Sequence, residues 1–88
     1  MGTSRKITIV NKKGLHARPA AGFVKLANGF ESKIRIKTDD KDVDGKSIMG
    51  VMLLAAAKGA QIEIIADGAD EDEAIDTLSD FVARGFNE

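Results

Sequence analysis

Three segments of this 88-residue chain alternate apolar and polar side chains, and this alternation restricts the fold more than any other feature. The segments cover residues 6–10, 32–38 and 61–66. A period of two is typical of strands that bury one face and leave the other in water. Residues 42–44 are expected to add at most a short edge strand, because their charges discourage pairing with other chains. We therefore expect an antiparallel sheet with one covered face.

Segments between and after these strands place apolar side chains at helical spacing, over residues 17–28, 47–57 and 70–84. The middle segment contains a glycine that costs about 1 kcal/mol relative to alanine, so we expect that helix to be short. The last helix opens with Asp70 and Glu73, which have the spacing of a capping box. The order strand, helix, strand, strand, helix, strand, helix predicts an α+β fold with its helices on one side of the sheet.

The composition argues against several classes of protein. The 13 basic and 14 acidic residues give a net charge of −1, and Trp and Tyr are absent, so nucleic-acid binding is not expected. No cysteine is present to form a disulfide or a reactive thiolate. The longest apolar stretch, residues 51–57, is too short for membrane insertion, and the N-terminus lacks a signal pattern. We expect one domain over residues 1–88, a monomer located in the cytoplasm.

Residues 14–20, Gly-Leu-His-Ala-Arg-Pro-Ala, hold the only histidine and the only proline of the chain. Pro19 suits the first turn of a helix, where its missing N–H costs nothing. His16, just before that turn, lies beside backbone N–H groups that lack an intrahelical partner and that, with the helix dipole, attract anions. Arg18 adds a permanent charge and donors suited to phosphate. The segment therefore predicts a titratable nucleophile, His16, at a phosphate site.

The chain lacks the other parts of a phosphate-transferring enzyme. It has no Walker-type glycine loop for ATP and no pair of carboxylates beside His16 for magnesium. A metal site is weakly supported, because carboxylates alone would have to complete it around one histidine. We therefore expect no metal and no cofactor, and we interpret His16 as an acceptor whose donor is another protein. A plainer alternative, an interaction module in which a lone histidine has no role, stays open.

Two motifs resemble the HPr family, the histidine-containing phosphocarriers of the bacterial phosphoenolpyruvate-dependent phosphotransferase system. One is residues 14–20 followed by Phe23-Val24, and the other is residues 46–52, Lys-Ser-Ile-Met-Gly-Val-Met. The order of the expected elements is also similar to that of the family. The resemblance implies an open-faced β-sandwich, in which four antiparallel strands in the order 1-4-2-3 are covered on one face by three helices.

The resemblance also implies roles for single residues. His16 would accept a phosphoryl group on Nδ1 from phospho-enzyme I and pass it to enzyme IIA domains in sugar uptake. Arg18 would neutralise charge on the phosphoryl group, and the backbone N–H groups of Ala17 and Arg18 would bind the phosphoryl oxygens. Because partners regenerate His16, we expect a phosphoryl carrier rather than a turnover enzyme. The alternative is a mainly regulatory protein, of a nitrogen-type or kinase-controlled pathway, that moves no sugar.

Ser47 has the residue type of a helix N-cap, and this interpretation needs no further function. The resemblance adds a second interpretation, in which HPr kinase/phosphorylase phosphorylates Ser47 to regulate the protein. A phosphate at this position adds negative charge and bulk. We therefore expect it to weaken the docking of enzyme I.

The residues after Ser47 are apolar, and some of them must belong to the core. Met side chains are also common at surfaces that meet several partners, because they adapt their shape. We expect Ile48 and Met49 to be exposed and to form the centre of a partner surface beside the histidine. Met52, Leu15 and Ala20 are expected to extend this surface.

Overall fold

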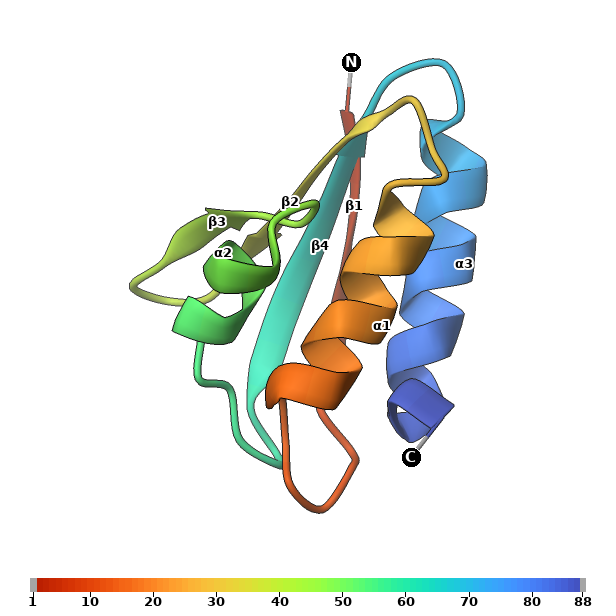
Figure 1. The fold of residues 1–88 in the computed structure, drawn as a ribbon. Helices are drawn as coiled ribbons and strands as arrows, with labels where there is room; N and C mark the ends of the chain where they lie inside the picture. Colours follow the sequence, from red (N-terminus) through yellow and green to blue (C-terminus); the bar gives the residue numbers. More distant parts are fainter. Residues whose placement is uncertain (1, 88) are drawn as a thin grey trace.

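The computed structural model describes residues 2–87, which form a four-stranded antiparallel sheet with helices packed on one face (Figure 1). The strand order is β1-β4-β2-β3, as the resemblance implied, and the expected α+β fold is confirmed. No helix in the described part of the chain is long and apolar enough to cross a membrane. In chain order the elements are β1 (Gly2–Thr8), α1 (Ala17–Ala27), β2 (Lys33–Lys37), β3 (Asp42–Asp44), α2 (Ile48–Leu53), β4 (Gln61–Asp67), α3 (Glu71–Ala83) and the 3-10 turn η1 (Gly85–Asn87).

The predicted alternation in β2 and β4 decides which side chains the helices cover. Ile34 and Ile36 of β2 are buried, as are Ile62, Ile64 and Ala66 of β4. The register sets Ile36 opposite Ile64 and Ile34 opposite Ala66, so these side chains share one face of the sheet. The helices close that face with Phe23, Val24, Val51, Ile75, Leu78 and Val82.

The uncovered face of the sheet carries charges of both signs. Glu63 of β4 lies opposite Lys6 of β1 and Lys37 of β2. At the β3 edge, the Asp42 carboxylate accepts a hydrogen bond from Arg35 Nε at 3.0 Å. Opposite charges on neighbouring strands stabilise a solvated face, and charges on a short edge strand discourage further pairing.

The first strand differs from the expectation. It covers Gly2–Thr8 rather than residues 6–10, because β4 continues to Asp67 and pairs with the polar start of the chain. That start shows no apolar alternation, so the pattern did not reveal it. Ile9 stays buried but leaves the sheet, and its N–H donates to the carbonyl oxygen of Ala60 at 2.9 Å.

The second helix is short, as its glycine suggested. It covers Ile48–Leu53 instead of residues 47–57, and the backbone soon adopts a left-handed conformation, with a φ of 48° at Ala55. Ser47 is the N-cap, and its Oγ accepts a hydrogen bond from the N–H of Gly50 at 3.2 Å. The capping role expected for this serine is confirmed.

The capping box expected at the start of α3 is wrong. Asp70 occupies the N-cap position, but its side chain makes no hydrogen bond that caps the helix. The carboxylate accepts hydrogen bonds from the backbone N–H groups of Glu31 and Ser32, each at 2.9 Å, and from the Ser32 hydroxyl. These bonds tie the α1–β2 loop to the start of α3, so a contact between distant segments has replaced the local one with Glu73.

Candidate functional site

The loop between β1 and α1 is held against the segment that follows α2. Leu15 donates its N–H to the carbonyl oxygen of Ala56 at 2.8 Å. Gly14 has a φ of +68°, and a Cβ atom there would lie 2.5 Å from the same oxygen. Only glycine permits this backbone conformation and this close approach together. Because Gly14 and Leu15 are held against Ala56, the following residue, His16, has a fixed position at the start of α1.

His16 is the N-cap residue of α1, with an extended backbone at φ −105° and ψ −169°. The first helical hydrogen bond runs from the N–H of Ala20 to the carbonyl oxygen of His16 at 3.0 Å. Pro19 has no N–H, and the first-turn N–H groups of Ala17 and Arg18 have no acceptor within the helix. His16 is half-buried, whereas Ala17 and Arg18 are exposed, so an anion can reach both amides.

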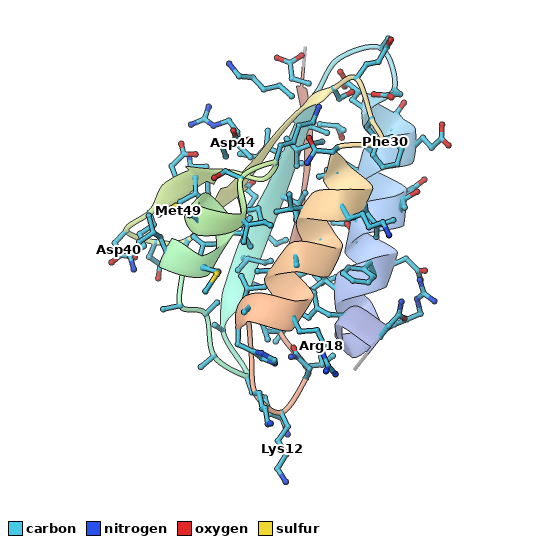
Figure 2. The ribbon with its side chains drawn as sticks, viewed as in Figure 1. Lys12, Arg18, Phe30, Asp40, Asp44 and Met49 are labelled. Carbon is cyan, nitrogen blue, oxygen red and sulfur yellow. The ribbon has the colours of Figure 1, made fainter. Side chains whose placement is uncertain are left out.

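A shallow pocket opens beside His16, and its lining is positively charged. Lys12, Lys13, Arg18 and Arg84 line it together with the histidine, and no acidic residue of the described chain does so. Figure 2 shows Lys12 and Arg18 at the same end of the molecule, where α1 begins. Several cations around one hollow attract an anion more strongly than a single charge would.

Arg84 is one of the site residues that sequence reasoning missed, together with Asn11, Lys12 and Lys13. It follows α3, whose C-terminal end lies beside the start of α1 (Figure 1). Its Nε forms an ion pair with Asp80 Oδ2 at 3.0 Å, one helical turn earlier. The sequence marks Arg84 only as the end of a helix, because its approach to the pocket depends on how α3 packs across the sheet.

The second helix presents an exposed apolar surface, as expected. Ile48 is 45% exposed and Met49 is 77% exposed, while Met52 and Leu53 are exposed as well. Val51, on the other side of this helix, is fully buried and holds it to the core. We call the exposed side chains of Ile48, Met49, Met52 and Leu53 the α2 surface; Figure 2 shows Met49 on it. Its role in partner binding stays a prediction.

Leu15 and Ala20 do not belong to the exposed surface, which corrects the expectation. Leu15 is 5% exposed and Ala20 is fully buried. Both side chains are part of the hydrophobic core, because the loop before α1 and the inner face of α1 pack toward the sheet. They contribute to the site by holding the backbone on either side of His16.

Ser47 begins α2 within a set of hydrogen bonds to the end of α1. The neighbouring Lys46 donates from Nζ to the carbonyl oxygen of Phe30 at 2.7 Å. Asn28 donates from Nδ2 to the carbonyl oxygen of Lys46 at 3.4 Å. These contacts fix the position of α2 relative to α1 and keep the half-buried serine next to the α2 surface.

Within residues 2–87, no group of three or more His, Cys, Asp or Glu side chains is arranged to hold a metal ion. The groups that line the pocket are the His16 imidazole, the guanidinium groups of Arg18 and Arg84 and the ammonium groups of Lys12 and Lys13, beside the backbone amides of Ala17 and Arg18.

Comparison with known proteins agrees with the fold and the motifs. The family model described as "PTS HPr component phosphorylation site" matches residues 3–84. The phosphocarrier protein HPr of Neisseria meningitidis is 49% identical over 84 residues, which cover 96% of this chain and 94% of that protein.

Solved structures give the same result. HPr-C-His from Thermoanaerobacter tengcongensis is 46% identical, with a TM-score of 0.93 over 98% of this chain and 97% of that chain. A dimer of HPr from the same organism is 49% identical, with a TM-score of 0.78 over 93% of this chain and 94% of that chain. The chain belongs to the HPr family, the phosphocarrier proteins of the phosphotransferase system.

Proposed function

We propose that His16 accepts a phosphoryl group from phospho-enzyme I and passes it to enzyme IIA domains, as a carrier in sugar uptake. The observation that carries this proposal is the position of His16 as the N-cap of α1, beside the first-turn amides of Ala17 and Arg18. Membership of the HPr family supplies the class of partner on each side of the transfer.

Transfer requires a neutral imidazole, because the lone pair on Nδ1 attacks phosphorus while the bond from phosphorus to the donor breaks. The phosphoryl group then bound to His16 carries about two negative charges. The two amides and the Arg18 guanidinium donate to its oxygens, while Lys12 and Lys13 add positive charge. The reverse step, with enzyme IIA as acceptor, regenerates the neutral histidine. The protein is therefore a carrier rather than a turnover enzyme.

The α2 surface supplies the apolar part of the docking site in this proposal. Its methionines, Met49 and Met52, adapt to partners of different shape, as a carrier between two proteins requires. Interfaces typically combine an apolar centre with a polar rim, and the cations around His16 provide such a rim.

We also propose that HPr kinase/phosphorylase regulates the protein by phosphorylating Ser47. The Ser47 Oγ caps α2 through the N–H of Gly50, directly before the exposed Ile48 and Met49. A phosphate adds about two negative charges there, so an apolar partner surface would dock less well. The second candidate function is that of a mainly regulatory protein that moves no sugar, because phosphorylation of Ser47 could regulate such a protein as well as a sugar-uptake carrier.

Residues 1–88 act in this proposal as one unit, a monomer in the cytoplasm. The mixed charges on the open face of the sheet and the short, charged β3 edge support the monomer, because neither favours a second copy. The dimer of the Thermoanaerobacter tengcongensis relative defines the alternative. Analytical ultracentrifugation separates the two, since a dimer would have twice the mass of the chain.

Incubation with enzyme I and radiolabelled phosphoenolpyruvate tests the main proposal. We expect an acid-labile, base-stable label on the wild type and on Ser47→Ala, and none on His16→Ala. Addition of a sugar-specific enzyme IIA should then remove the label. A label that persists on His16→Ala contradicts the acceptor role, and a label that no enzyme IIA removes favours the regulatory candidate. Mass spectrometry after treatment with HPr kinase/phosphorylase tests Ser47.

A further inference from the structure

Asn11, in the loop between β1 and α1, is buried without belonging to the apolar core. The residue is 8% exposed, and its side chain donates from Nδ2 to the carbonyl oxygen of Gly14 at 2.7 Å. Its backbone carbonyl oxygen accepts a hydrogen bond from the N–H of Gly14 at 3.1 Å. Asn11 therefore closes the turn that precedes the histidine with both its backbone and its side chain.

The carbonyl group held by Asn11 also holds the histidine. The carbonyl oxygen of Gly14 accepts a second hydrogen bond, from the backbone N–H of His16 at 3.2 Å. One side-chain donor thus fixes the acceptor for the amide of the phosphate-accepting residue. Asn11 lines the same pocket as His16 and Arg18, so any movement of this turn changes the geometry of that pocket.

Asn11 is also fixed from its other side. Gly85, just after α3, lies beside it, and a Cβ atom at Gly85 would be in van der Waals contact with the Asn11 Cβ, at 3.5 Å. The side chain therefore lies between the end of α3 and the turn that carries His16. This position couples the two segments that line the pocket.

The Asn11 side chain stabilises the folded state less than an apolar side chain of similar shape would. Its Oδ1 is buried and has no hydrogen-bond partner among residues 2–87. A buried acceptor without a partner destabilises the folded state, whereas an apolar side chain of similar shape would not. The donor on Nδ2 is therefore the feature that distinguishes asparagine from an apolar residue here.

We propose that Asn11 is a positioning residue for phosphoryl transfer, which sets His16 toward the amides of Ala17 and Arg18 by fixing the carbonyl group of Gly14. This inference rests on the proposed phosphoacceptor role of His16. A small displacement of a reacting group can slow a reaction by one or two orders of magnitude, so we expect removal of Asn11 Nδ2 to slow transfer about tenfold.

The test uses the full chain and phosphoramidate, a small phosphoryl donor that needs no partner protein. The bond from phosphorus to the amine of phosphoramidate breaks, the bond from phosphorus to the imidazole forms, and ammonia leaves. Asn11→Ala removes the donor, and Asn11→Leu removes it while keeping the branched shape. Ser32→Ala is the matched control, because it also removes a buried hydrogen-bonding group. Ser32 belongs to the α1–β2 loop, which lies at the other end of α1 from the pocket (Figure 1).

We expect both Asn11 variants to react about tenfold more slowly and Ser32→Ala to react at the wild-type rate. Hydrogen exchange gives a second readout, in which the His16 amide exchanges faster in the Asn11 variants while the core amide of Ile64 is unchanged. With phospho-enzyme I as donor, the turnover rate should fall in the Asn11 variants. The KM of enzyme I for the protein should stay constant, because the α2 surface is intact.

Folded Asn11 variants with wild-type rates would overturn the proposal, as would an equal slowing in Ser32→Ala. If neither Asn11 variant folds, the side chain is a core residue and the proposal is again overturned. These results concern Asn11 alone, provided that the wild type is labelled on His16. A wild type that takes no label from either donor would overturn the proposed function together with this inference.

Discussion

The N-cap residues of α1 and α2 both have an extended backbone, but the two helices differ in whether a side chain caps the first-turn amides. Ser47 caps α2 with its own side chain, which accepts the hydrogen bond from the N–H of Gly50. His16 makes no side-chain hydrogen bond that caps α1, and the amides of Ala17 and Arg18 have no acceptor within the helix. A helix that caps itself is stable without a ligand, whereas one that does not offers donors to an anion. This difference separates the proposed acceptor from the proposed regulatory residue.

Removal of the cation at the α1 start should have the largest effect after loss of the histidine itself. We expect Arg18→Ala to slow phosphoryl transfer about a hundredfold, because a donor that faces the transferred group is lost. Arg84→Ala should slow it less, since the ion pair with Asp80 already neutralises part of its charge. Rapid-quench measurement of transfer from enzyme I compares the two. An equal loss in both variants would show that only the total charge of the pocket matters.

A charge on the α2 surface should act on docking and leave the chemistry intact. We expect Met49→Asp to raise the KM of enzyme I for the protein about tenfold, because an apolar side chain at the interface is replaced by a charged one. Its thermal midpoint should be unchanged, since Met49 is 77% exposed. Steady-state kinetics and calorimetry check this, with Lys33→Asp on the open sheet face as the control. An unchanged KM would remove the α2 surface from the docking site.

Loss of the cap on α2 should affect stability and not phosphorylation of the histidine. We expect Ser47→Ala to lower the free energy of unfolding by about 1 kcal/mol, because the N–H of Gly50 loses its acceptor. Urea denaturation measures the change. In contrast, His16→Ala should not reduce stability by loss of a cap, since His16 makes no capping hydrogen bond. An unchanged free energy of unfolding in Ser47→Ala would contradict the capping role.

The start of α3 is a third case, and it predicts a small dependence of stability on pH. The hydrogen bond from the Ser32 hydroxyl lowers the pKa of Asp70 below its usual 3.8, and the backbone N–H of Glu31 acts in the same direction. A carboxyl whose pKa is lowered on folding stabilises the protein above the unfolded pKa. This stabilisation is lost as the pH falls through the folded value. Thermal midpoints of wild type and Asp70→Asn should therefore differ near neutral pH and converge in acid. A constant difference would contradict this.

Local chemistry made part of this molecule predictable. The alternation in β2 and β4 showed which isoleucines are buried, and Pro19 marked the start of α1 at the correct residue. The type of Ser47 predicted its capping bond. Each of these signals depends on neighbours within a few residues along the chain.

Contacts between distant segments could not be predicted from the same signals. The Asp70 carboxylate accepts a hydrogen bond from the N–H of Ser32 and does not cap α3. Arg84 lines the pocket because α3 ends beside the start of α1. Leu15 appeared suited to an exposed surface but is buried, because its loop packs against Ala56. Such contacts arise from the packing of the helices on the sheet.

The central claim is that the α1 start holds a phosphoryl group with its histidine and its first-turn amides. Nuclear magnetic resonance of the protein phosphorylated by enzyme I tests it most directly. We predict a phosphorus signal coupled to Nδ1 of His16, together with a downfield shift of the amide protons of Ala17 and Arg18 as they donate to phosphate oxygens. A phosphate on any other residue, or unshifted amides at these two positions, would contradict the account.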